Sequence, residues 1–172
     1  NISGKNKIAM SELKAGFIET GYTAVYTYLN SGNVVFSSDT DDTVILSDTI
    51  KSMIKNKFEL DIPVFVILQK ELEDILNNAP DWWGNDNKEI YDNLIFMFPL
   101  LSYDEFYSAV GIPNEEHEKV YNYKNKSISD TYQSGQADML FDYFYLNDLK
   151  LFLRTFLSNR WGFAVCFRFC IC

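Results

Sequence analysis

Two short polar stretches of this chain carry residue types that bind small anions in proteins. They are Gly4, Lys5, Asn6 and Lys7 in the first stretch, and Asn30, Ser31, Gly32 and Asn33 in the second. The first stretch precedes a predicted helix, whose N-terminal backbone N–H groups attract phosphate or carboxylate, and its glycine and lysines favour the same ligands. The asparagine amides of the second stretch can donate directional hydrogen bonds. Together, the two stretches predict a binding site for a small anionic ligand.

The same residues also have a purely structural explanation, which the sequence leaves open. Glycine and asparagine are the residues that tight turns require, and exposed lysines are commonly solvated. The spacing also differs from the known phosphate-binding motifs, because neither Gly-x-x-x-x-Gly-Lys-Ser/Thr nor Gly-x-Gly-x-x-Gly occurs in the chain. The two stretches therefore either bind an anion or only shape two turns.

A tryptophan pair, Trp82 and Trp83, is a secondary candidate for ligand contact. Indole rings can stack on a planar ligand. The flanking residues Asp81 to Asn87 are rich in turn formers, however, and such a pair commonly packs within a turn between two domains. A structural role for the two tryptophans is the simpler interpretation.

No set of residues predicts catalysis or a metal centre. His117 is the only histidine and stands among glutamates on a predicted surface loop, so no Ser-His-Asp or Cys-His arrangement can form without it. The three cysteines, Cys166, Cys170 and Cys172, lack the paired Cys-x-x-Cys spacing that zinc sites favour. We therefore predict no catalytic residue, no metal site and no cofactor.

Charge and hydrophobicity limit the class of protein. Aspartate and glutamate outnumber lysine and arginine by 24 to 15, and the net charge of −9 disfavours nucleic-acid binding, because phosphates need a basic surface. Hydrophobic residues make up 47% of the chain, which allows a compact core. No apolar run approaches the roughly 18 uncharged residues of a membrane span. We expect an acidic, soluble, cytoplasmic protein without nucleic-acid or membrane partners.

A helix that follows the glycine-lysine stretch is the first predicted element. We place it over residues 11–20, with Ser11 as its N-cap and Gly21 in the left-handed conformation after its end. Leu13 and Phe17 lie four residues apart, so they fall on one face of the helix. This helix would present its N-terminus to the predicted anion site.

A hairpin follows, with strands over residues 26–29 and 34–36 and a turn in which Gly32 or Asn33 takes positive φ. The remaining elements predicted for the first half are a helix near 46–58, a buried strand over 62–68 and a short helix over 69–78. The order of helix, hairpin, helix and strand is typical of an α+β protein.

The hairpin segment Thr27–Phe36, with Gly4–Met10 upstream and Trp82-Trp83-Gly84 downstream, resembles the bacterial domain-of-unknown-function family 1697. The resemblance covers residues 1–125 approximately. It implies an α+β fold of two tandem ferredoxin-like (α/β plait) subdomains, with antiparallel sheets covered by helices. It is silent on activity.

In this resemblance, residues 1–80 would form the first subdomain and residues 81–172 the second. Family members carry a further apolar strand before the glycine-bearing loop. The resemblance therefore implies an N-terminally truncated chain that lacks its first strand. That loss would leave a gap or an open edge beside the hairpin.

The sequence changes character after about residue 125. Before that point, a strand over 94–98, a helix capped by Ser102 and closed by Gly111, and a strand over 119–123 repeat the plan of the first half. After it, all three arginines and all three cysteines lie beyond residue 150, and the apolar end Trp161–Cys172 is typical of aggregation-prone segments. A disrupted reading frame and a divergent end are the two explanations.

Three classes of function remain. The first, which the sequence favours, is a non-catalytic domain that binds a small molecule or anion through the two polar stretches. The second is a protein-interaction domain that uses an exposed sheet edge at the hairpin. The third is an enzyme acting on a phosphorylated metabolite, for which the sequence offers no base or nucleophile.

Overall fold

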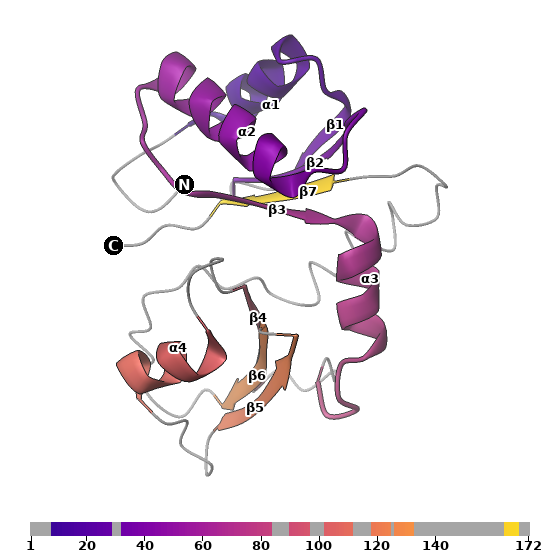
Figure 1. The fold of residues 1–172 in the computed structure, drawn as a ribbon, viewed down its shortest axis with the longest axis vertical. Helices are drawn as coiled ribbons and strands as arrows, with labels where there is room; N and C mark the ends of the chain where they lie inside the picture. The colour runs from indigo at the N-terminus through magenta and orange to yellow at the C-terminus, as the bar shows by residue number, and fades with distance from the viewer. Residues whose placement is uncertain are drawn as a thin grey trace. The chain divides into compact units, whose positions relative to one another are not determined.

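The computed structural model describes residues 8–28, 32–83, 90–96, 102–111, 118–124, 126–132 and 164–168. The chain divides into two compact units (Figure 1), one made of Asn1–Glu73 with Asn159–Cys172 and the other of Asp74–Ser158. Each unit combines helices with an antiparallel sheet, which confirms the predicted α+β class. The boundary falls inside a helix that ends shortly before residue 80, and the division into two ferredoxin-like halves stays a prediction.

The first helix, α1 (Met10–Glu19), begins earlier than predicted. Its N-cap is Ala9, which makes no side-chain capping bond, so the prediction of Ser11 as N-cap is wrong. The reason lies in packing: Ile8 and Leu13 stand just before the cap and in the following turn, and both are buried in one cluster. This hydrophobic staple fixes where the chain enters the helix.

The end of α1 follows the prediction. Gly21 has a φ of 100°, its N–H donates to the carbonyl of Ile18 at 3.0 Å, and the N–H of Tyr22 donates to the carbonyl of Phe17 at 3.2 Å. These two bonds form a Schellman motif, which needs a left-handed residue after the helix. Glycine adopts that conformation without steric cost.

The predicted hairpin is present. β1 (Thr23–Tyr28) and β2 (Asn33–Ser37) pair antiparallel, with Tyr28 opposite Asn33. Gly32 takes the positive φ, at 80°, and Asn33 does not. A bulge interrupts the register between Thr23 and Tyr26.

The remaining elements of the first unit contribute further residues to its hydrophobic core. Asp42 caps α2 (Thr43–Phe58) by accepting hydrogen bonds from the N–H groups of Val44 and Ile45. β3 (Val64–Leu68) follows, and then α3 (Gln69–Asn77). Figure 1 shows α1 and α2 on the same side of the sheet. The buried residues between the helices and the sheet include Phe17, Phe36, Leu46, Ile50, Ile54, Val34 and Val66.

The first sheet is completed from the far end of the sequence. β7 (Ala164–Arg168) lies between β2 and β3, in the strand order β1-β2-β7-β3, and runs antiparallel to both neighbours. The predicted gap beside the hairpin is therefore filled. Part of the segment expected to behave as an exposed, aggregation-prone end is instead a central strand, because pairing on both sides satisfies its backbone.

The second unit contains β4 (Ile90–Phe96), α4 (Tyr103–Val110), β5 (Glu118–Tyr123) and β6 (Lys126–Tyr132). Its sheet has the order β4-β6-β5, and both pairings are antiparallel. Ser102 and Glu105 form a capping box at the start of α4, and Gly111 ends the helix with a φ of 101°. The predicted helix limits are confirmed, whereas β4 begins earlier than predicted.

Within the described part of the chain, no helix has the length and apolar composition to cross a membrane. The same residues contain no group of three or more His, Cys, Asp or Glu side chains that could hold a metal ion.

Candidate functional site

The predicted anion site falls largely outside the described residues. Gly4, Lys5, Asn6, Lys7, Asn30 and Ser31 all lie there, so the structure does not test whether the two stretches meet. Gly32 is buried in the turn, and Asn33 is 4% exposed at the start of β2. Asn33 is therefore too enclosed to contact a ligand from solvent. It is the first residue of the second hairpin strand.

One feature of the described residues bears on anion binding. The N-cap of α1, Ala9, supplies no side-chain acceptor, so no side chain caps the first-turn N–H groups of this helix from that position. Glu12 in the same turn already places a negative charge near the helix N-terminus. The helix dipole favours such a charge, but a second anion there would be repelled by it.

The two tryptophans differ in their surroundings. Trp83 is 6% exposed, and its backbone N–H donates to the backbone carbonyl of Pro80 at 2.9 Å, so Trp83 packs within the turn. Trp82 is only half-buried, and the Nζ of Lys119 lies 6.0 Å from its ring centroid. Trp83 thus has the structural role, and Trp82 remains accessible to a ligand.

Lys119 belongs to a row of side chains that sequence reasoning missed. It alternates along β5 with Tyr121 and Tyr123, so the three share one face of the strand. The two tyrosine rings are stacked, with centroids 6.4 Å apart and an interplanar angle of 20°. The alternation of Lys119, Tyr121 and Tyr123 in the sequence was the signal that could have revealed this surface.

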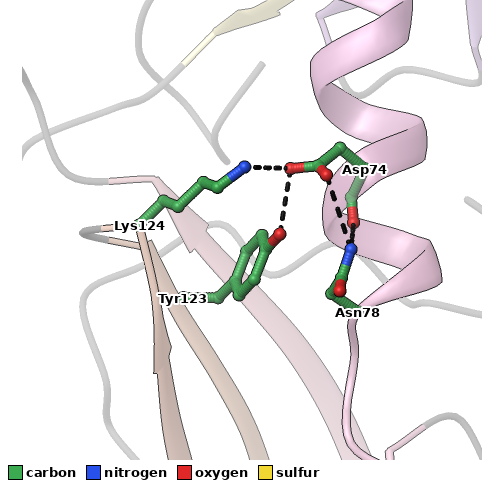
Figure 2. A network of polar contacts seen from close by, with 4 residues as sticks. All are labelled: Asp74, Asn78, Tyr123 and Lys124. Carbon is green, nitrogen blue, oxygen red and sulfur yellow. Dashed lines mark hydrogen bonds and ion pairs between the residues drawn. The ribbon is translucent and has the colours of Figure 1, made fainter.

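A polar network borders this row at the turn between β5 and β6 (Figure 2). The Oδ2 atom of Asp74, on α3, accepts hydrogen bonds from the Tyr123 hydroxyl at 3.1 Å and from the Lys124 Nζ at 2.7 Å. The side-chain amide of Asn78 donates to the backbone carbonyl of Asp74 at 2.8 Å. The network therefore links α3 to the β5–β6 hairpin.

The polar network holds the β5–β6 turn to α3. The hydrogen bond to Asp74, supported by that with Tyr123, raises the pKa of Lys124. The amine is thus held in its charged form, which is neither a base nor a nucleophile. No catalytic arrangement appears among these residues.

The hairpin edge of the first unit is an exposed sheet edge among the described strands. β1 pairs with β2 on one side, and no described strand lies on its other side. Thr23, Ala24 and Tyr26 are exposed, with Tyr26 at 43%, whereas Val25 is buried in the core. The Lys14 Nζ lies 5.7 Å from the Tyr26 ring centroid. The edge of an antiparallel sheet presents backbone N–H and C=O groups that a further strand can pair with.

Comparison with known proteins places the chain in a family. A family model described as "Protein of unknown function (DUF1697)" matches residues 1–127. The chain belongs to this family. The match ends close to where the sequence changes character, and it confirms the resemblance drawn from the hairpin and the tryptophan turn.

A solved structure supports the fold of this DUF1697 member. The conserved bacterial protein SP0830 from Streptococcus pneumoniae is 25% identical, with a TM-score of 0.63, and the match covers 78% of this chain and 73% of that one. No curated protein matches the chain. Neither the family description nor the neighbour's title states an activity.

Proposed function

We propose that this DUF1697 member is a non-catalytic binding domain that takes up an extended polypeptide segment at the β1 edge. The observation that carries the proposal is that β1 pairs on one side only among the described strands, at the rim of a sheet with a firmly buried core. Extended peptides bind such edges by adding a strand, with affinity from main-chain hydrogen bonds and specificity from alternate side chains.

The bulge in β1 limits where a partner can pair. The register with β2 is irregular between Thr23 and Tyr26, and Ala24 has a φ of 46°, in the left-handed region. Such bulges interrupt the ladder and protect an edge from indiscriminate pairing. A partner strand would therefore pair along the regular part, Tyr26 to Tyr28, beside the exposed Tyr26 ring.

Peptide titration followed by NMR tests this proposal. The probe is a panel of extended synthetic peptides with alternating valine and threonine, and the amide signals of residues 26–28 should shift on binding. Tyr26→Lys should weaken binding up to about fivefold, since a cross-strand aromatic contact contributes roughly 0.2–1 kcal/mol. Tyr121→Lys is the matched control, because Tyr121 is 40% exposed on a strand of the other unit. Shifts confined to other strands would refute the proposal.

A second candidate function is binding of a small anion at Gly4 to Lys7 with Asn30 and Ser31, without the enclosed Gly32 and Asn33. The observation that favours it is that Ala9 provides no side-chain cap at the N-terminus of α1, and the charge of Glu12 in the same turn acts against it. A phosphate or carboxylate held by Lys5 and Lys7 would then satisfy first-turn N–H groups.

Thermal melts at low salt with inorganic phosphate and nucleotides test the anion candidate. A ligand at about 100 times its dissociation constant should raise the free energy of unfolding by about 2.7 kcal/mol, and Lys5→Ala should abolish the shift. Lys70→Ala is the control, because Lys70 is an exposed lysine whose ion-pair partner is the exposed Asp41. An equal shift in both variants, or no shift in the unmodified protein, would contradict the candidate.

A further inference from the structure

One lysine of α1 lies at the β1 edge, next to the exposed tyrosine of that edge. The Nζ atom of Lys14 is 5.7 Å from the centroid of the Tyr26 ring. The buried residues of α1 are Leu13, Gly16 and Phe17, whereas Lys14 is only half-buried, so it lies outside the core-facing side of the helix. A positive charge therefore stands beside the part of β1 with which the proposed partner strand would pair.

No neighbouring carboxylate neutralises this charge. Every other lysine in the described part of the first unit has a carboxylate partner: Lys51 and Lys55 pair with Asp61, Lys57 with Glu19, and Lys70 with Asp41. For Lys14, the described residues provide the contact with the Tyr26 ring and no ion pair. Glu12 is two positions from Lys14, a spacing at which helical side chains do not face each other. Lys14 is thus available to a carboxylate that arrives with a partner.

A strand added to β1 would bring its own side chains within reach of Lys14. Directly opposite residues of antiparallel strands have Cα atoms about 4.5–5.5 Å apart, and diagonal neighbours are about 7–8 Å apart. A glutamate opposite or diagonal to Tyr26 therefore has its carboxylate within reach of the Lys14 amine. Cross-strand neighbours of opposite charge attract each other, whereas a lysine at the same position would be repelled.

The same charge disfavours a second copy of this chain as the partner. Two copies that paired along β1 about a two-fold axis would bring both Lys14 side chains to one shared edge, because such an interface uses the same residues twice. Like charges there repel each other, and lysines at sheet edges commonly protect proteins against self-pairing. The β1 edge therefore fits an acidic segment of another polypeptide better than it fits a second β1.

We propose that the β1 edge selects acidic extended segments, and that Lys14 determines this preference. The partner segment pairs along Tyr26 to Tyr28 and carries a glutamate or aspartate beside Tyr26. This inference rests on the proposed function, because it names the class of partner for the same edge. The net charge of −9 opposes the preference only weakly, since exposed charges farther apart than about 8 Å are largely screened at physiological salt.

Peptide titration followed by NMR tests the preference in the full chain. Three probes share an alternating valine and threonine sequence and differ at one central threonine position, which holds glutamate, glutamine or lysine. The glutamate peptide should bind about two- to fivefold more tightly than the glutamine peptide, and the ratio should decrease as the salt concentration rises. Lys14→Glu should reverse the order, so that the lysine peptide binds most tightly.

Lys70→Glu is the matched control, because it makes the same change in net charge at an exposed lysine of α3 and should leave the order of the peptides unchanged. Equal binding of the glutamate and glutamine peptides, with the amide signals of residues 26–28 still shifting, would overturn the preference and leave the β1 edge as a peptide site. If no probe shifts these signals, the preference and the proposed function are both refuted. Shifts of the same signals on raising the protein concentration alone would indicate self-pairing and would also overturn the preference.

Discussion

At the level of single residues, the Tyr123 hydroxyl makes a hydrogen bond between sequence-distant parts of the second unit. It donates to Asp74 at 3.1 Å across 49 positions of sequence. Tyr123→Phe removes only this hydroxyl and should lower the free energy of unfolding of the unit by about 1 kcal/mol. Tyr121→Phe is the control, because the Tyr121 ring is exposed and no hydrogen bond of its hydroxyl is found in the described region. Chemical denaturation measures both, and equal effects would count against the bond.

The capping box at the N-terminus of α4 should stabilise the helix in a way that depends on pH. Hydrogen bonds from the Ser102 hydroxyl and then the Ser102 backbone N–H lower the pKa of Glu105. Because the folded pKa lies below the unfolded one, the stabilisation is present above about pH 4.3 and is lost as the pH falls through the folded value. NMR titration of the Ser102 and Glu105 amides should show this loss, and Glu105→Gln should remove it. A titration at the ordinary glutamate pKa would contradict the prediction.

At the level of elements, one side chain caps the N-terminus of α2. The Asp42 carboxylate accepts from the N–H groups of Val44 and Ile45 at 3.0 and 3.1 Å. Asp42→Ala should lower the free energy of unfolding of the first unit by about 1 kcal/mol, since these donors lose their acceptor. Asp39→Ala makes the same charge change at an exposed position outside the helix and should have little effect. Differential scanning calorimetry on both variants distinguishes a capping effect from a charge effect.

At the level of the whole molecule, the two sheets differ in the sequence separation between their paired strands. β5 and β6 adjoin each other, whereas β7 pairs with β2 and β3 from the other end of the chain. Non-local pairing slows folding because the loop must close before any contact forms. Pulsed hydrogen exchange during refolding should therefore protect β5 and β6 before β2, β3 and β7.

The variant Val165→Pro tests whether β7 is needed for the late protection of β2 and β3. Proline removes a backbone donor from a central strand, so protection of β2 and β3 should be delayed or lost while β5 and β6 are unaffected. Protection of β2 and β3 at an unchanged rate would show that β7 is not needed to complete their sheet.

Features that depend on neighbouring residues could be predicted from the amino-acid sequence. Gly21 after α1, Gly32 in the hairpin and Ser102 before α4 were all predicted, because caps and turns follow from the backbone freedom or hydrogen bonding of one or two residues. The family and the α+β class were also evident from the sequence. The start of α1 was missed by a short distance, because the burial of Ile8 outweighs the capping preference of Ser11.

Which distant segments of the chain pair with one another became evident from the three-dimensional structure. The place of β7 between β2 and β3, the bond from Tyr123 to Asp74 and the opposing characters of Trp82 and Trp83 could not be read from local pattern. A strand's hydrophobic residues show that it must be buried, but not beside which partner. That choice depends on which sheet position is left vacant by the rest of the fold, and this is a property of the whole chain.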